Sequence, residues 1–547
     1  MAIADLEPRV TARLEAWRRE RIGSRIWARD HTVWSREQVP ELSDRLGWLA
    51  LPSVSPRALD RQLMLADEVA AEGFERVLLL GMGGSSLAPE LYQETFGNAP
   101  HRPMLTVLDS THPAAVESAR QAVPLERTLF VVSSKSGTTI ESASLLSYFW
   151  AEASKTSREP GRQFVAITDP ATPLERLAVE GRMRQVFTAP PDVGGRYSAL
   201  SVFGTVPAAL IGVDLHRLLQ RAQIMARACA VDVPETSNPA LQLGAVLGEA
   251  ARAGRDKLTF CTSRSVASLP TWLEQLIAES TGKGGRGIIP VAGEALGSAS
   301  TYGPDRFFAS IVVEGDPFDE TPLDRLTEAG FAQVGLRLAD RYDVGQEIFR
   351  WEMATAAAGA ILGVHPFDQP DVQLAKDLAR QAMSKDETNE LDSSRERLVE
   401  VDSSNARALE RGLESLFESA RIGDYVSIQA YLAPHAAVTA SLAAMQAAIR
   451  DRTRLATTCG FGPRFLHSTG QLHKGGPNTG IFLQLVDEPP HDVPVPGTDY
   501  TFGKLIRAQA LGDYRALTGR LRRVLRINLG HDTLASLQKV REACVGI

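Results

Sequence analysis

Residues 129–141 read LFVVSSKSGTTIE and combine two features that decide the fold. The apolar run 129–132 predicts a short buried strand, and the apolar spacing after Ile140 predicts a helix. Between them, residues 133–139 hold five hydroxyl side chains, one Lys and one Gly. Hydroxyls and free backbone N–H groups at the start of a helix stabilise a phosphate, whereas a helix cap needs only one hydroxyl. The turn therefore favours an anion site over a simple cap.

Apolar runs of strand length alternate with helical patterns around this turn. The expected strands are residues 77–80, 105–108, 129–132 and 164–167, and the expected helices are 57–73, 86–96, 140–153 and one starting at Ala114. This alternation predicts a doubly wound, parallel α/β sheet. Ligands of such sheets bind beyond the carboxyl ends of the strands, which is where the polar turns fall.

Two further units are expected after this sheet. The second has strands at 257–262, 308–313 and 332–338 and helices at 270–280, 346–362 and 370–383. The third has strands near 425–432 and 479–486, joined by a long loop rich in Gly and His. The expected segments are an N-terminal helical segment 1–54, units 55–235 and 236–383, a charged linker or insertion 384–418, and a C-terminal α/β unit 419–547.

Composition limits the class of partner. The 547 residues carry a net charge of −7, which argues against nucleic acid or an anionic membrane as the main partner. Four scattered cysteines without Cys/His ligand spacing indicate a reducing cytoplasm and no structural metal site. The start of the chain shows no secretory signal. The longest uncharged run, residues 197–213, contains Gly204 and Pro207 and is not expected to span a membrane. We expect a soluble, cytoplasmic protein.

A second polar turn follows the strand at 77–80. Residues 81–86 read GMGGSS, which matches neither GxGxxG nor a P-loop. A tight turn is the simplest interpretation, since glycine tolerates positive φ. Beside the hydroxyl-rich turn, these glycines favour close approach of Gly84 and Ser85 to a ligand.

Two further segments offer catalytic groups. Arg196 follows two glycines and precedes an apolar run, which favours an inward side chain able to stabilise an oxyanion. The helix expected at 270–280 places Gln275 and Glu279 on one face. A glutamate there is usually solvated, but near a closed phosphate pocket it would act as a general base.

The last two motifs contain a lysine and two histidines. Residues 365–376, HPFDQPDVQLAK, predict a turn and a helix that places Gln369 and Lys376 on one face. Residues 464–478 hold His467 and His473 in a Gly-rich segment without a third metal ligand nearby. Acid/base chemistry or substrate contact is favoured for these histidines.

In this order, these motifs resemble the glucose-6-phosphate isomerase family, and most closely the isomerase half of bacterial transaldolase/glucose-6-phosphate isomerase fusions. The resemblance covers most of residues 55–380 and continues through the C-terminal unit. It implies two sugar-isomerase (SIS-type) domains, a sugar phosphate substrate and no cofactor or metal. The phosphate would be bound by Ser85, Ser134, Lys135, Ser136 and Thr139.

The resemblance also implies catalytic roles. Arg196 would stabilise an enediolate, Glu279 would move a proton between C2 and C1, and Lys376 would assist ring opening. Gln275 and Gln369 match pocket glutamines of the family.

One histidine departs from the family's order. The family's ring-opening histidine lies between the Glu and the Lys, where this chain has only His365. The motif Leu-His-Ser-x-Gly-Gln instead occurs at residues 466–471. We therefore assign ring opening to His467, with His473 in reserve.

The expected activity is interconversion of glucose 6-phosphate and fructose 6-phosphate through a cis-enediolate. The alternatives are an isomerase that also accepts mannose 6-phosphate, and a non-catalytic sugar-phosphate-binding SIS protein. The only partner expected is a small sugar phosphate, and the family makes a homodimer possible.

Overall fold

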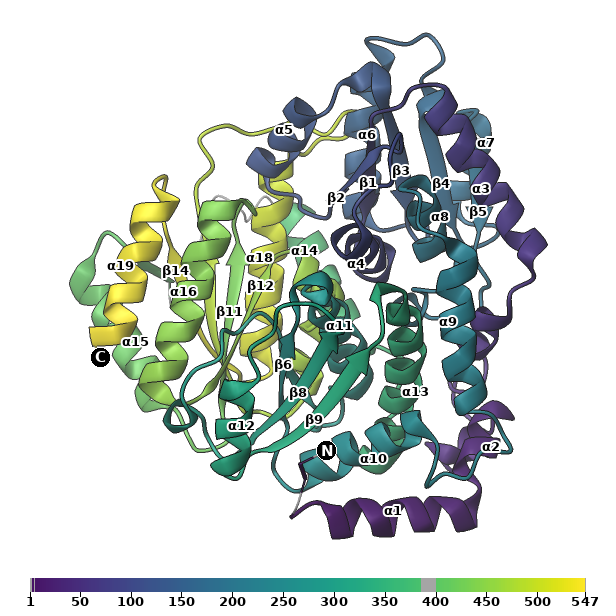
Figure 1. Cartoon of the computed structure of the whole chain (residues 1–547). Coiled ribbons are helices and arrows are strands. Elements are labelled where there is room, and N and C mark those ends of the chain that lie inside the picture. Colours follow the sequence, from purple (N-terminus) through teal and green to yellow (C-terminus); the bar gives the residue numbers. More distant parts are fainter. Residues whose placement is uncertain (1, 4, 385–399, 547) are drawn as a thin grey trace.

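The computed structural model describes residues 2–3, 5–384 and 400–546, and in that part of the chain the strands form three parallel sheets (Figure 1). Each sheet is built from apolar strands followed by helices, the pattern that the sequence predicts. The fold class is confirmed: two parallel α/β units with a further α/β unit at the C-terminus.

The first sheet has the strand order β2-β1-β3-β4-β5. Its strands are β1 (Arg76–Gly81), β2 (Met104–Leu108), β3 (Thr128–Ser133), β4 (Phe164–Thr168) and β5 (Gln185–Thr188). The strand order reverses between β1 and β3, and a doubly wound sheet binds its ligand at that point. Leu80 of β1 pairs with Val132 of β3. The glycine turn and the hydroxyl turn therefore leave the sheet side by side.

Helices cover both faces of this sheet (Figure 1). They are α3 (Pro56–Ala71), α4 (Leu87–Phe96), α5 (Pro113–Ala122), α6 (Ile140–Ser154), α7 (Pro173–Glu180) and α8 (Val202–Leu210). Helix α6 begins directly after the hydroxyl turn.

The second sheet has the order β7-β6-β8-β9. Its strands are β6 (Lys257–Thr262), β7 (Ile289–Val291), β8 (Arg306–Val313) and β9 (Ala332–Leu338). The accompanying helices are α9 (Leu215–Ala228), α10 (Pro239–Arg252), α11 (Leu269–Thr281), α12 (Thr321–Glu328), α13 (Val344–Leu362) and α14 (Val372–Ser384). Helix α11 follows β6, and every one of its residues except Thr271 is buried. Its polar side chains therefore need partners inside the protein.

The third sheet has the order β10-β14-β13-β11-β12. Its strands are β10 (Glu400–Asp402), β11 (Tyr425–Tyr431), β12 (Ala456–Phe461), β13 (Gly480–Val486) and β14 (Arg523–Asn528). Its helices are α15 (Ala406–Glu418), α16 (Ala436–Thr453), α17 (Gly470–Gly475), α18 (Phe502–Gly519) and α19 (Thr533–Gly546).

Two sequence predictions for this third unit are wrong. The expected long loop between its first two strands is largely α16 and β12. Helix α16 is rich in alanine and β12 contains threonine and glycine, so neither has a strong apolar period. The expected linker is also wrong for residues 400–418, because Leu409, Leu413 and Leu416 of α15 lie in the core of the third unit. Residues 385–399 lie outside the described residues.

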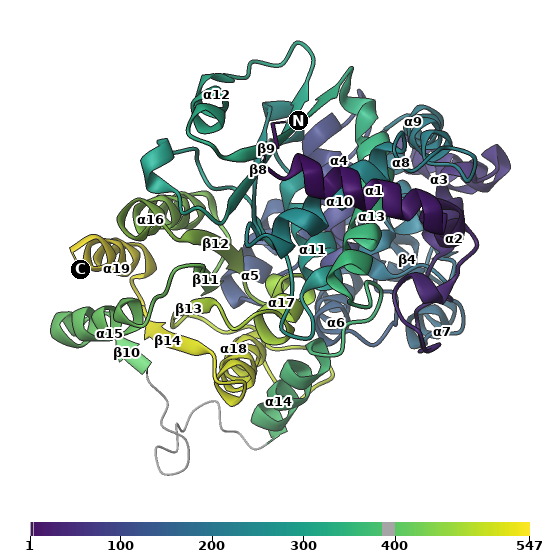
Figure 2. The ribbon, with the colours of Figure 1, turned by 90° about the horizontal axis from the view of Figure 1, so that it is seen from below.

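The three units and the N-terminal segment pack into one body. Helix α1 (Glu7–Glu20) lies along α10, and α2 (Ile22–Trp27) follows it (Figure 2). Helix α14 packs against α18 of the third unit through Ala382, Ala508 and Leu511. The third unit therefore supports a helix whose chain segment belongs to the second. No helix in the described ranges is long and apolar enough to cross a membrane.

Candidate active site

Arg196 lies in the short turn η6 (Gly195–Tyr197) after β5 and is 3% exposed. Its guanidinium donates to four oxygens: Oγ of Ser280 at 2.8 Å, Oε1 of Gln369 at 2.9 Å, and the carbonyls of Pro366 at 2.7 Å and Asp368 at 3.0 Å. A guanidinium held in this way has a fixed position. The expectation that Arg196 points inward is confirmed.

The glycine turn after β1 explains how the Arg196 turn reaches this position. A Cβ on Gly84 would clash with the carbonyl oxygen of Gly195, and one on Gly83 would lie 2.8 Å from the carbonyl oxygen of His467. Gly83 also has φ of +56°. Only glycine allows the three backbones to approach so closely. Gly84 therefore sets the position of the Arg196 turn, and the neighbouring Ser85 is buried in the same turn.

Helix α11 carries the candidate base. Oε2 of Glu279 lies 3.7 Å from Nη1 of Arg196, and both side chains are buried. Gln275, one turn earlier, donates from Nε2 to Oε2 of Glu279 at 3.3 Å and to the carbonyl oxygen of His467 at 2.7 Å. A buried carboxyl next to a fixed cation and an amide can accept a proton without leaving an unpaired charge.

His467 reaches this region from the third unit. It ends the turn η10 (Arg464–His467), which follows β12. Its Nε2 donates to Oε1 of Glu141 at 2.9 Å, and Nε2 of Gln509 on α18 donates to the same oxygen at 2.8 Å. Burial alone would raise the pKa of Glu141, but His467, the backbone and Lys376 outweigh it, and the pKa lies below its ordinary value. The ionised carboxylate fixes the imidazole and leaves Nδ1 for other contacts.

A cavity of about 270 Å³ opens beside this histidine. Its lining joins the hydroxyl turn, α14 and the third unit, and includes Ser136, Thr138, Thr139, Glu141, Lys376, His467 and Gln509. Lys376 is half-buried on α14, and its charge reaches Glu141. The structure therefore brings the expected lysine, histidine and hydroxyls to one cavity.

The hydroxyl turn presents a helix start to this cavity. Thr139 is the residue before α6, and in the described structure its side chain makes no capping bond to that helix. Oγ of Ser134 instead donates to Oγ1 of Thr139 at 3.2 Å, and Oγ of Ser136 lies 2.9 Å from Oγ1 of Thr138. The cap interpretation therefore fails for Thr139. The backbone N–H of Glu141 interacts with its own carboxylate, and the other N–H groups at a helix start can bind an anion.

Lys135, unlike Ser136, Thr138 and Thr139 of the same turn, does not line the cavity. Its ammonium pairs with Asp169, in the loop after β4. Burial lowers the pKa of Lys135 despite this pair. Lys135 holds the hydroxyl turn to the next loop of the sheet.

A second lysine holds the segment that supports Arg196. Nζ of Lys283, just after α11, donates to the carbonyl of His365 and to Oδ1 of Asp368 at 2.7 Å. Burial, with repulsion from Arg196, lowers the pKa of Lys283 to about 7. The sequence prediction missed this residue, although its place directly after the candidate base was a usable signal.

His473 and His365 lie away from the cavity. His473 is buried under the third sheet, with Nδ1 3.2 Å from Nε2 of Gln429 and Nε2 3.4 Å from Oγ of Ser427. Burial lowers its pKa well below the ordinary value. His365 accepts from the backbone N–H of Phe367 at 3.1 Å and so closes its own turn. Of the three histidines, the structure brings only His467 to the cavity.

The partners of His467 were also missed from the sequence. Glu141 lies in the first turn of α6, where an acidic residue is common because it stabilises the helix dipole. Gln509 lies within an amphipathic helix. Their pairing with the histidine depends on contacts between units that no local pattern reveals.

Comparisons with known proteins find similar sequences. The family model of phosphoglucose isomerase matches residues 68–294. Glucose-6-phosphate isomerase of Heliobacterium modesticaldum is 29% identical over 61% of this chain and 86% of its own length. The enzyme of Thermus thermophilus is 28% identical over 63% of this chain and 91% of its own.

Solved structures show the same fold. A hypothetical protein from Thermus thermophilus is 26% identical, with a TM-score of 0.59 over 70% of this chain and 97% of its own. Glucose-6-phosphate isomerase from Chlamydia trachomatis has a TM-score of 0.52 at 19% identity, over 69% of this chain and 80% of its own, which shows the fold alone.

The parallel sheets, with polar turns at the switch point of the first, form a parallel α/β fold shared with the solved glucose-6-phosphate isomerase. Among proteins of that fold, the sequence is similar to glucose-6-phosphate isomerases, and the phosphoglucose isomerase model covers residues 68–294.

Proposed function

We propose that this chain is an aldose–ketose isomerase that interconverts glucose 6-phosphate and fructose 6-phosphate through a cis-enediolate. The relatives at 27–29% identity, matched over most of their own length, support this activity. The observation that carries the proposal is the buried contact of 3.7 Å between Arg196 and Glu279. A base and a fixed cation at this separation suit the two charges that develop during isomerisation.

Proton transfer is assigned to Glu279. Its carboxylate would remove the proton from C2 of the open-chain aldose and return it to C1. The negative charge then grows on O1 and O2, where Arg196 would stabilise it. Gln275 steadies the carboxylate through its amide and keeps the His467 backbone beside it. Its Oε1 is buried with no hydrogen bond in the described structure, so it remains able to accept from a substrate hydroxyl.

Ring opening is assigned to His467 and Lys376. With Nε2 bonded to Glu141, the imidazole presents Nδ1 to the ring oxygen and the anomeric hydroxyl. Lys376 lines the same cavity and supplies a positive charge beside the histidine. The two groups would move one proton between the anomeric hydroxyl and the ring oxygen.

The phosphate group is assigned to the hydroxyl turn. Ser136 and Thr139 line the cavity where α6 begins, and Ser134 supports Thr139 from behind. Phosphate bound there orients C1 and C2 toward Glu279, which raises the rate by positioning. Lys135, Gln369, Gly84 and Ser85 are assigned supporting roles around this turn and around Arg196. His473 is assigned to the core of the third unit.

A coupled assay of the purified protein tests the activity. Fructose 6-phosphate should be converted to glucose 6-phosphate, and mannose 6-phosphate should be offered in parallel to define the substrate range. If the protein binds fructose 6-phosphate without converting it, the isomerase assignment is wrong and the sugar-phosphate-binding alternative replaces it.

Three broader assignments stay proposals. The scattered cysteines support a cytoplasmic location. The added third unit supports the likeness to the isomerase half of a transaldolase fusion. A homodimer is also proposed, although Arg196, Glu279, Lys376 and His467 all come from one chain. Sedimentation together with specific activity across enzyme concentrations tests whether activity depends on association.

A further inference from the structure

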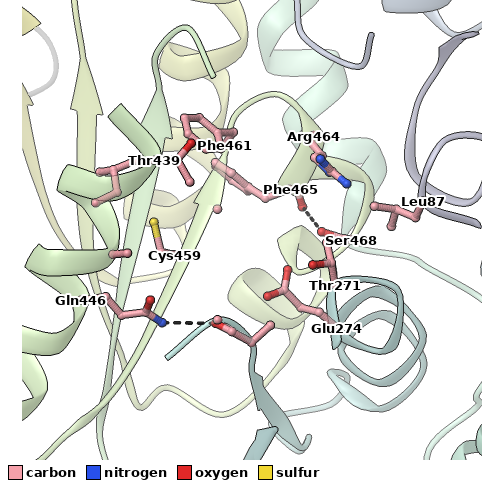
Figure 3. Close-up of a pocket in the computed structure, with 15 residues that line it drawn as sticks. Leu87, Thr271, Glu274, Thr439, Gln446, Cys459, Phe461, Arg464, Phe465 and Ser468 are labelled. Carbon is pink, nitrogen blue, oxygen red and sulfur yellow. Dashed lines mark hydrogen bonds between the residues drawn. The ribbon is translucent and has the colours of Figure 1, made fainter. Parts of the chain in front are cut away.

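A second cavity of about 270 Å³ lies between the second and third units (Figure 3). Its walls come from α11, the segment after β7, α16, the end of β12 and η10, and Leu87 of α4 in the first unit adds one side. The carboxyl ends of two edge strands, β7 and β12, meet here, and such strand ends are frequent ligand sites. The cavity contains neither Glu279 nor His467 nor Lys376.

Glu274 supplies the charged group of this cavity. Its side chain points toward the open space in Figure 3 and the residue is only 9% exposed. Among the described residues, none forms a hydrogen bond or ion pair with its carboxyl. A buried carboxyl without a partner is costly, and burial raises the pKa of Glu274 to about 8.

The nearest cation, Arg464, does not form an ion pair with the Glu274 carboxyl. Arg464 also lines the cavity, but its guanidinium pairs with Glu90 and, at 3.2 Å, with Asp109. Its charge only partly offsets the burial of Glu274. The cavity thus holds an unpaired acid and a cation already engaged by two other acids, which disfavours phosphates and other anionic ligands.

The remaining walls are mainly apolar. Leu87, Leu442, Phe461 and Phe465 line the space, and aromatic rings attract cations through their faces. An apolar cavity of about 150 Å³ holds a benzene molecule, so this larger one has room for a substituted ring. The walls suit a ligand with an apolar body and one positive end.

We propose that this cavity is a binding site for a small organic cation, with its ammonium group on Glu274 and its apolar body between Phe461 and Phe465. The ligand would lie behind the catalytic helix, because Glu274 directly precedes Gln275 on α11. It would also contact Ser468, the residue after His467. The site is separate from the sugar cavity and does not depend on the isomerase assignment.

Calorimetry with 2-phenylethylammonium as the probe tests the proposal on the full chain. We expect saturable binding of one amine per chain, and at least about tenfold weaker binding of the neutral 2-phenylethanol. Glu274→Gln should weaken amine binding by at least about tenfold and leave the alcohol unchanged. The matched control is Glu347→Gln, since Glu347 is another buried acid of raised pKa that lies outside the cavity.

A second variant closes the site from its exposed mouth. Ala443 on α16 is exposed and lines the cavity, so Ala443→Phe should block the amine without disturbing the core. Excess fructose 6-phosphate should not displace the amine from the parent protein. Displacement would place the amine in the sugar cavity and overturn the proposal.

The pH dependence gives an independent readout. The titratable groups around Glu274 are Arg464 on η10 and the Cys459 thiol on β12, with Glu90 and Asp109 behind Arg464. Burial raises the pKa of Cys459 to about 12, so it stays neutral. Amine binding needs ionised Glu274 and should therefore strengthen from pH 6 to pH 8. No binding at any pH in this range, or equal binding of amine and alcohol, would overturn the proposal.

Discussion

Glu279 and Glu274 are buried carboxyls on the same helix, α11, yet they face opposite surroundings. Glu279 has the Arg196 guanidinium at 3.7 Å and the Gln275 amide at 3.3 Å. Glu274 has no such partner among the described residues and faces a largely apolar cavity. The helix thus turns one acid toward a fixed cation and the other toward open space. Partners, more than burial, decide what each carboxyl can do.

The largest effect is expected for Glu279→Gln. The amide keeps the size of the side chain but cannot accept the C2 proton, so kcat should fall by about 10⁴-fold. Fructose 6-phosphate binding, measured by calorimetry, should change little. Glu347→Gln serves as the control for removing a buried acid elsewhere. If Glu279→Gln turned over substrate nearly as fast as the parent protein, Glu279 would not be the base, and its contact with Arg196 would not set it apart from Glu274 in function.

Arg196→Lys tests the cation of the same pair. The ammonium keeps the charge but cannot donate to all four oxygens that hold the guanidinium. We expect kcat/KM to fall by about 10³-fold because the charge no longer faces the developing oxyanion. Steady-state kinetics measures kcat/KM for Arg196→Lys and for the control variant Arg227→Lys, whose arginine is exposed. A loss equal to that of the control would show that Arg196 only supports the fold.

His467→Ala and His473→Ala separate a cavity histidine from a core histidine. His467→Ala should lower kcat by about 10²-fold and cost less stability than His473→Ala, because Gln509 still donates to Glu141. His473→Ala should instead lower the free energy of unfolding by about 1–3 kcal/mol, because Ser427 and Gln429 lose a buried partner. Thermal unfolding and turnover are measured on both. The reverse pattern would transfer ring opening to His473.

The last prediction concerns stability instead of turnover, through Glu274 and pH. The unfolded chain releases this proton at the ordinary value near 4.5, whereas the folded chain keeps it until about pH 8. The folded state therefore binds more protons between these values, and its stability falls as the pH rises, by at most about 1.4 kcal/mol per pH unit. Glu274→Gln should flatten this slope in urea unfolding at pH 5 to 8. An unchanged slope would contradict the buried, unpaired state of Glu274.

Sequence patterns predicted the elements that contain continuous apolar runs. The strands before the glycine and hydroxyl turns were clear because a central parallel strand is buried on both faces. Helix α16 and strand β12 were missed because alanine and threonine give weak periodic signals. The sequence also missed strands in the first two units, β5 and β7, which have only four and three residues and so show little periodicity.

The candidate site was predictable as a set of residues but not as an arrangement. The motifs singled out Arg196, Glu279, Lys376 and His467. The structure pairs Arg196 with Glu279 and places Lys376 and His467 at one cavity. The contact of His467 with Glu141 joins residues that are 326 positions apart, and no local pattern encodes it. The lack of a partner for the Glu274 carboxyl likewise depends on the cavity between the second and third units, which no local pattern predicts.

The most direct test follows the C2 proton itself. Fructose 6-phosphate is incubated with enzyme in D₂O, and deuterium at C1 and C2 is read by proton NMR. The parent protein should incorporate deuterium from solvent while it forms glucose 6-phosphate, and Glu279→Gln should do neither although it still binds the sugar. Undiminished incorporation by Glu279→Gln would contradict the assignment of proton transfer to the Arg196-facing carboxyl of α11.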